Sequence, residues 1–216
     1  MSKLFLLVLL LPIAYGLSIV AQKLCDKLLQ GKTAELAEWG YTYEAPICSK
    51  TILFAMLYVV LGMACWFAQS IKGEILSCVL LVQLVIISII DFKYQFIFDE
   101  QNLLLALTGL ARLMDYPTVW KEPLFAGLGA FVIMFILMLI SRGAIGGGDV
   151  KLMGALGIWL GIFGIINTFV YGIIAGGVGA IALLLMRKKS HKDAFAFGPY
   201  LCLGAIYAWY LQCVKW

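Results

Sequence analysis

Two aspartates, Asp91 and Asp149, lie where a carboxylate is costly to keep, and this makes them candidates for chemistry. Asp91 directly follows the apolar run 81–90, and Asp149 follows three consecutive glycines at the start of another apolar run. Two carboxylates held close together cannot both ionise easily, so one keeps a proton and acts as an acid while the other activates water. If the two aspartates share a site, the sequence predicts the acid–base pair of an aspartic peptidase.

The glycine run before Asp149 consists of Gly146, Gly147 and Gly148. Glycine has no Cβ, so another backbone can approach such a loop closely. An extended peptide beside the loop would then place its scissile bond at the Asp149 carboxylate. The alternative is that Asp149 only caps a helix that begins near Lys151.

A second acidic pair, Asp99 and Glu100, follows Asp91 along the chain. These two residues are expected to cap the next helix near Gln101, where their charge is favourable. The alternative for Asp99 is a supporting role in the site formed by the two catalytic candidates.

The composition predicts a membrane protein. Of the 216 residues, 63% are hydrophobic and 13% are charged, whereas soluble domains are about 45–50% apolar. A soluble chain of this kind would expose more apolar surface than its own core could cover, so membrane lipid is the expected solvent. The net charge of +4 fits basic cytoplasmic loops, and no nucleic-acid partner is expected.

Eight apolar segments predict an all-α, polytopic membrane protein with about eight transmembrane helices. A spanning helix needs about 20 residues, so the fourth and sixth segments are short. Seven spans is the alternative, because the division between the sixth and seventh segments rests only on Gly164, Asn167 and Thr168. The eight segments cover residues 4–21, 51–69, 74–91, 101–114, 123–141, 151–165, 167–186 and 196–213.

The positions of lysine and arginine orient these segments. With eight helices, most of the 16 basic residues fall in the loops on one side, which the positive-inside rule places in the cytoplasm. Both termini then lie outside, and residues 22–50 form a short cytoplasmic loop within a single integral-membrane domain, 1–216. Asp91 and Asp149 both lie at the cytoplasmic ends of their helices. The basic residues on that side are Lys23, Lys27, Lys32, Lys50, Lys93, Arg142, Lys151, Arg187, Lys188, Lys189 and Lys192.

The first 16 residues have the features of a signal peptide, but the apolar run continues to Ala21, so a retained first helix is expected. The six cysteines form no C-x-x-C pair, and neither a zinc site nor a redox motif is expected from them. Free thiols are predicted, with a disulfide as the alternative.

Small residues recur at four-residue spacing in two places, Gly157 with Gly161 and Gly172 with Gly176. This Gly-x-x-x-Gly pattern lets helices approach closely where lipid provides no hydrophobic drive for association. Close helix packing is therefore predicted at both pairs.

The pattern resembles that of the type IV prepilin peptidases, membrane aspartyl proteases with a G-x-G-D motif. The segment 146–149 matches that motif. The stretch Asp91–Asp99 matches an earlier family stretch that opens with Asp and ends in Pro-Asp, with Phe98 in place of the proline. The segment 197–199 matches a Phe-Gly-Pro motif before the last helix. The resemblance covers residues 80–205, with the three motifs in the family's order.

The resemblance implies cleavage of positively charged leaders from type IV prepilins or pseudopilins at the cytoplasmic face of the bacterial inner membrane. It implies that Asp91 and Asp149 are the catalytic pair and that Gly146, Gly147 and Gly148 form the loop beside the substrate. The residues expected to support this site are Asp99, Lys151, Gly198 and Pro199.

Longer members of the family bind zinc through two C-x-x-C pairs in the first cytoplasmic loop. That loop here has only Cys25 and Cys48, and a structural zinc site needs four ligands, so no metal is expected. Proteolysis is expected to need no cofactor. Many members also methylate the new pilin N-terminus, and S-adenosylmethionine would be required only if this chain retains that activity. Weak or absent methylation is predicted because the first loop is short.

Two other classes of function compete with the peptidase. A transporter or channel subunit could also place aspartates within a membrane, but it would favour a polar path across both faces. An inactive scaffold would keep Asp91 and Asp149 apart. The peptidase hypothesis is preferred because both acids are predicted at one face.

Overall fold

The computed structural model describes residues 3–38, 42, 48–67, 71–114, 120–141, 145–185 and 196–214. Within these ranges the regular structure is entirely α-helical, and this confirms the all-α prediction. The chain divides into two units, Met1–Tyr94 and Gln95–Trp216, and each is considered by itself.

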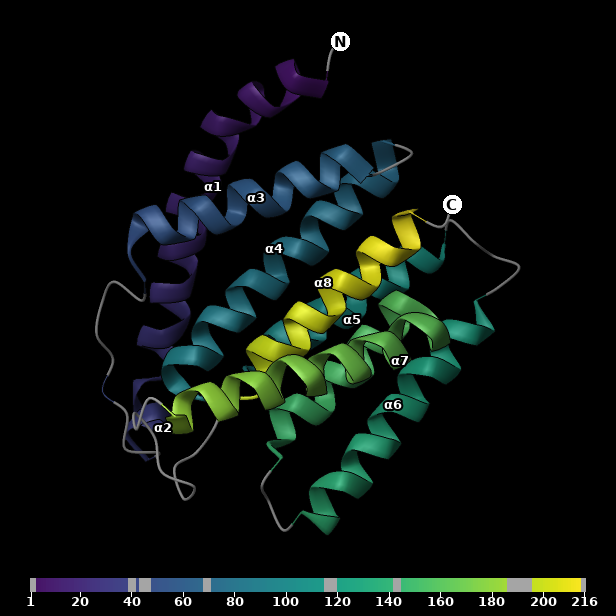
Figure 1. Cartoon of the computed structure of the whole chain (residues 1–216). Coiled ribbons are helices and arrows are strands. Elements are labelled where there is room, and N and C mark those ends of the chain that lie inside the picture. Colours follow the sequence, from purple (N-terminus) through teal and green to yellow (C-terminus); the bar gives the residue numbers. More distant parts are fainter. Residues whose placement is uncertain are drawn as a thin grey trace. The chain divides into compact units, whose positions relative to one another are not determined.

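The first unit is built on α1, with α3 packed against α1 and α4 packed against α3 (Figure 1). Leu10 and Ala14 of α1 meet Leu61 of α3 in a buried apolar cluster. The ring edge of Tyr15 packs against Phe54, with 6.1 Å between ring centroids. Cys78 and Val82 of α4 pack against the same cluster, and α4 carries a catalytic candidate in its last turn. The helices of this unit are α1 (Lys3–Gly31), α2 (Thr33–Glu38), α3 (Lys50–Phe67) and α4 (Ile71–Tyr94).

The second unit is organised around α7, which packs against α5, α6 and α8 (Figure 1). A Cβ added at Gly157 would lie 2.6 Å from the Cα of Gly127 on α6, so only glycine permits this approach. A Cβ added at Gly176 would lie 3.0 Å from the Phe197 ring. Close packing is thus confirmed at these glycines. The helices are α5 (Asp99–Leu113), α6 (Lys121–Ile140), α7 (Gly147–Leu185) and α8 (Gly198–Val214).

The helix α7 is interrupted at Gly161, whose φ of 67° and ψ of −174° lie in a region that glycine alone adopts readily. A Cβ added at Gly161 would lie 2.7 Å from a carboxylate oxygen of Glu122 on α6, so the predicted close packing is confirmed there. The expected division at Gly164–Thr168 was wrong, because the helix is broken at Gly161 instead. The polar side chains there do not break the helix, because each donates a hydrogen bond to the carbonyl four residues earlier. Asn167 donates to Phe163, and Thr168 donates to Gly164.

The backbone groups released by the break at Gly161 are bound by side chains from the three helices around α7. A backbone group buried without a partner would cost about as much as a lost hydrogen bond, so these side chains make the break tolerable. Arg112 of α5 donates to the Trp159 carbonyl, Gln212 of α8 donates to the Leu160 carbonyl, and Glu122 of α6 accepts from the Ile162 N–H.

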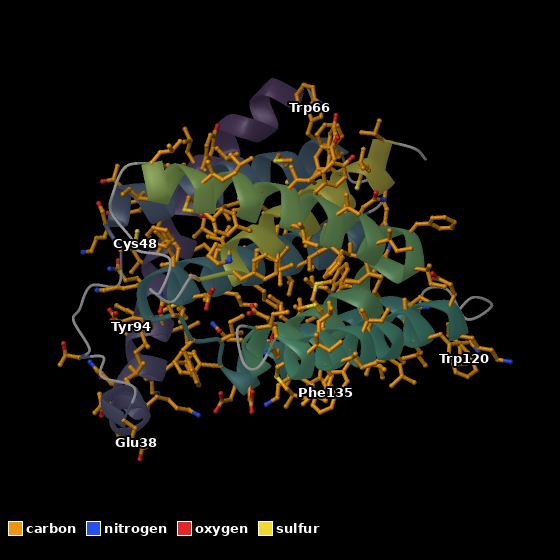
Figure 2. All side chains as sticks on the ribbon, turned by 60° about the horizontal axis from the view of Figure 1, so that its bottom comes forward. Glu38, Cys48, Trp66, Tyr94, Trp120 and Phe135 are labelled. Atoms are coloured by element: carbon orange, nitrogen blue, oxygen red, sulfur yellow. The ribbon has the colours of Figure 1, made fainter. Side chains whose placement is uncertain are left out.

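Four segments of the described chain are long and apolar enough to cross a membrane: Lys50–Phe67, Ile75–Tyr94, Lys121–Ile140 and Gly147–Ala182. The last of these has 36 residues, which would extend about 54 Å as one straight helix, longer than a hydrocarbon core of about 30 Å. The side chains of Trp120 and Phe135, at the start and within α6, project from the surface of the second unit (Figure 2). The structure thus supports a multi-helix membrane protein, and the count of eight spans stays a prediction.

Candidate active site

Asp91 lies on the buried side of α4, in its last turn. Leu80, Leu84, Ile87 and Asp91 follow one another at spacings of three and four residues, and all four are buried. This spacing places them on one face of the helix. The neighbouring Phe92 lies off this face and is 75% exposed. Asp91 therefore continues a buried apolar face of α4. A carboxylate there is costly to bury, so Asp91 is a candidate for a functional role.

Asp149 lies in the first turn of α7 and is also buried. The helix begins at Gly147, and the Asp149 N–H donates to the Gly146 carbonyl at 3.1 Å. Asp149 is therefore the third residue of the helix, and the alternative that it is an N-cap in front of Lys151 is wrong. The helix starts earlier than expected because the glycines themselves form its first turn.

The glycine run is held against the start of α5. A Cβ added at Gly148 would lie 3.0 Å from the Cβ of Ile97, so the start of α7 is in close contact with the turn that precedes α5. The Asn102 side chain donates from Nδ2 to the Gly148 carbonyl at 3.3 Å. At Gly147, by contrast, an added Cβ would meet no atom within 4 Å among the residues that the structure describes. Gly148 is thus packed against the turn before α5, while no described residue packs against Gly147 on its Cβ side.

Asp99 does not cap α5, because the helix begins at Asp99 and the capping position is Phe98, which makes no side-chain capping bond. Phe98 has φ −71°, close to the value that a proline would impose, so the turn forms without the family's proline. Both carboxylate oxygens of Asp99 instead accept from Lys151 Nζ at 2.7 Å. The ion pair joins the first residue of α5 to the fifth residue of α7. Two of the four residues expected to support the site, Asp99 and Lys151, are therefore in contact with each other.

Gly198 and Pro199 begin α8. Proline suits the first turn of a helix because the N–H it lacks would have no partner within the helix. The preceding Phe197 accepts backbone hydrogen bonds from Tyr200 and Leu201 through its carbonyl, at 3.1 and 3.2 Å. Its ring packs at Gly176 in the second half of α7. The structure thus gives this motif a role in docking α8 onto α7.

Metal ligands are not gathered in the described ranges: no three His, Cys, Asp or Glu side chains lie together there. All six cysteines are free thiols, which confirms the prediction against a disulfide. Burial, reinforced by the negative charge of Asp26, raises the pKa of Cys25 to about 11. Since zinc binds the thiolate, Cys25 is a poor ligand in this environment.

Asp91 belongs to the first unit and Asp149 to the second. The structure thus places each acid at the end of a helix, and their approach to one shared water stays a prediction. Within the second unit, the start of α7 contacts α5 at two points. Asn102 of α5 binds the Gly148 carbonyl, next to Asp149, and Asp99 of α5 pairs with Lys151 of α7.

Two contributors to the glycine loop were missed from the sequence, Ile97 and Asn102. Ile97 gives no signal, because an apolar residue between helices is unremarkable. Asn102 gives one: it is an amide at the start of the apolar run 103–107, and a buried polar side chain needs a partner.

Comparison with known families agrees with the motifs. Residues 78–181 match the model of the type IV leader peptidase family. A prepilin leader peptidase/N-methyltransferase of Bacillus subtilis is 25% identical over 169 residues, covering 75% of this chain and 68% of the relative. Relatives with the same name from Pectobacterium carotovorum and Legionella pneumophila are 28% and 26% identical, covering 68% and 82% of this chain.

The chain spans only 51% and 64% of these last two relatives, so it is shorter than either of them. No solved structure matched the chain. The segment matched by the family contains Asp91, the glycine run and Asp149, together with the helices α5 and α6 that lie between them. Residues 78–181 of this chain therefore belong to the type IV leader peptidase family.

Proposed function

We propose that the protein is an aspartyl endopeptidase of the bacterial inner membrane that removes leader peptides from type IV prepilins or pseudopilins. Asp91 and Asp149 are its catalytic pair, and the cut is made at the cytoplasmic face. The observation that carries this proposal is that the family segment, residues 78–181, contains both acids, each buried at the end of a helix. Relatives named prepilin leader peptidase support the same substrate class.

The chemistry needs one protonated and one ionised carboxyl group. The ionised member of the pair takes a proton from water while the water oxygen bonds to the scissile carbonyl carbon. The protonated member donates its proton to the carbonyl oxygen. When the tetrahedral intermediate collapses, one of its hydroxyl groups returns its proton to the ionised member of the pair as the C=O bond reforms. The C–N bond breaks, and the leaving amine takes up the proton of the other member, so that the pair again holds one proton. No cofactor enters these steps.

The glycine loop would guide the substrate in this mechanism. Within the described ranges, a Cβ added at Gly147 would meet no atom within 4 Å, whereas Gly148 is packed against Ile97. An extended peptide backbone can therefore lie along the Gly147 side, next to the Asp149 carboxylate. The Asp99–Lys151 ion pair holds the start of α5 beside this loop.

The proposed topology has eight membrane-spanning helices, with both termini outside. The length of α7 and its break at Gly161 support two passes rather than one. The basic residues counted on one side support a cytoplasmic position for the start of α7 and the end of α4.

Methylation of the new pilin N-terminus is a separate activity. The relatives carry N-methyltransferase in their names, and S-adenosylmethionine would be the donor if the activity is present here. We expect weak or absent methylation from this chain. Mass spectrometry of the mature pilin tests this, and stoichiometric methylation that depends on the protein would overturn it.

Cleavage of a purified prepilin in detergent tests the proposed function. Wild-type protein should release the leader, and Asp91→Asn or Asp149→Asn should abolish release while the protein remains inserted in the membrane. Asn keeps the size of the side chain and removes its acid–base function. Normal cleavage by Asp149→Asn protein would show that the mechanism is wrong, and no cleavage by wild-type protein of any prepilin offered would refute the substrate class.

A further inference from the structure

We propose that Asn102 is a positioning residue that fixes the glycine loop and thereby the Asp149 carboxylate. This proposal rests on the proposed peptidase function. Asn102 lies in the first turns of α5, is only 5% exposed, and donates from Nδ2 to the Gly148 carbonyl at 3.3 Å. The bonded carbonyl belongs to the residue directly before Asp149, so the amide acts one peptide unit away from the proposed catalytic group.

Stability alone gives a weak reason for an amide at this position. The Gly148 carbonyl lies in the first turn of α7, where a carbonyl accepts the ordinary helical bond from four residues later. The bond from Asn102 is therefore an additional one. The Oδ1 of Asn102 is buried and meets no hydrogen-bond donor in the part of the chain that the structure describes. A half-satisfied buried amide is less favourable than an apolar side chain of similar size.

Geometry offers the better reason. Helix α7 begins with Gly147 and Gly148, and glycine is the residue with the most backbone freedom to lose. A catalytic carboxylate carried on such a segment needs an external hold, because a misplacement of about 1 Å can reduce a rate about a hundredfold. Ile97 restricts the loop on one side by packing. Asn102 adds a directional bond to the backbone, which packing by an apolar side chain does not supply.

A matched control lies two turns further along the same helix. Thr108 accepts a hydrogen bond from the Trp159 indole N–H at 3.0 Å, so it also ties α5 to α7 through a single polar contact. This contact is far along α7 from the glycine loop. Thr108→Val removes it while keeping the size of the side chain.

The test compares Asn102→Leu with Thr108→Val in steady-state cleavage of a purified prepilin, together with the melting temperature of each protein in detergent. We expect Asn102→Leu to lower kcat by about tenfold or more, with KM within about threefold and little loss in melting temperature. Thr108→Val should keep kcat within about twofold of the wild-type value. Asn102→Ala removes the same donor without adding bulk, and it should show the same loss of kcat if Asn102→Leu folds poorly.

Two results would overturn the proposal. One is wild-type kcat in both Asn102 variants. The other is a fall in kcat of Thr108→Val equal to that of Asn102→Leu, which would assign both effects to general docking of α5. Asp149→Asn protein, assayed in parallel, separates this failure from failure of the proposed function. If Asp149→Asn is inactive while the Asn102 variants are normal, only the role of Asn102 is refuted.

Discussion

Replacing Gly148 by alanine tests whether the glycine run at the start of α7 must lie directly against Ile97 in the turn before α5. The added Cβ would lie 3.0 Å from the Ile97 Cβ and 3.4 Å from the Ile97 carbonyl oxygen. Neither of these atoms can rotate away, because one is bonded to the Ile97 Cα and the other is part of the backbone. The loop or the turn before α5 therefore has to shift by a few tenths of an ångström. Overpacking of this kind costs about 1–3 kcal/mol.

The same shift should reduce activity. Gly148 adjoins Asp149, so the displaced backbone carries the proposed catalytic carboxylate with it. Since a misplacement of about 1 Å can cost about a hundredfold in rate, a shift of a few tenths of that size predicts a loss in kcat of roughly threefold to tenfold. The assay is steady-state cleavage of a purified prepilin in detergent, with the melting temperature measured on the same preparations.

Gly147→Ala is the matched control, because it adds the same methyl group one residue earlier, where no atom of the described part of the chain lies within 4 Å. It should leave both the melting temperature and kcat close to the wild-type values. Its KM is a second readout, since a substrate backbone passing along this side would meet the methyl group. Full activity of Gly148→Ala, or an equal loss of kcat in both variants, would refute the packing argument.

Three further outcomes are expected. Asp99→Asn removes the ion pair with Lys151, but the Asp99 side chain is 68% exposed and the Lys151 side chain 48%. The free energy of unfolding should therefore fall by less than about 1 kcal/mol, and the cleavage rate should stay within about threefold of the wild-type rate. Abolished cleavage by a folded variant would instead assign Asp99 a part in the chemistry. Cleavage should survive EDTA, and a loss that zinc restores would contradict the expectation of no metal. A reporter fused at Trp216 should report a non-cytoplasmic position, and a cytoplasmic signal would exclude the eight-helix topology with both termini outside.

The helical segments could be predicted from the sequence because the bilayer imposes a length and an apolar composition on each of them. The runs 51–69 and 123–141 correspond to α3 and α6 within two residues at each end. Helix starts were predicted less well. Both α5 and α7 begin with residues that are usual in loops, an acidic pair in one case and glycines in the other. Hydrophobicity cannot detect a first turn of that composition.

The break in α7 shows where local sequence is insufficient. Asn167 and Thr168 are the polar residues of that segment, yet they bond back to their own helix and leave it intact. The helix breaks instead at Gly161, where Arg112 and Gln212 from other helices bind the released carbonyls. These partners are about 50 residues away in the sequence, so no local pattern could have indicated them.

The candidate site likewise contains residues that could be predicted from the sequence and contacts that only the structure shows. Asp91 and Asp149 could be found from the sequence because a carboxylate beside an apolar run is rare and its chemistry is familiar. The ion pair of Asp99 with Lys151 depends on α5 and α7 lying side by side, and only the structure provides that arrangement. The role of Asn102 depends on the same arrangement.

The most direct test of the central claim is a comparison of single-turnover cleavage rates for Asp91→Asn, Asp149→Asn and the double variant. If the two carboxylates act as one acid–base unit, removing either one removes the whole unit, so all three proteins should share one residual rate. Each should also insert into the membrane as the wild-type protein does. Partial activity in both single variants, with losses that multiply in the double variant, would show that Asp91 and Asp149 act independently and would contradict the shared site.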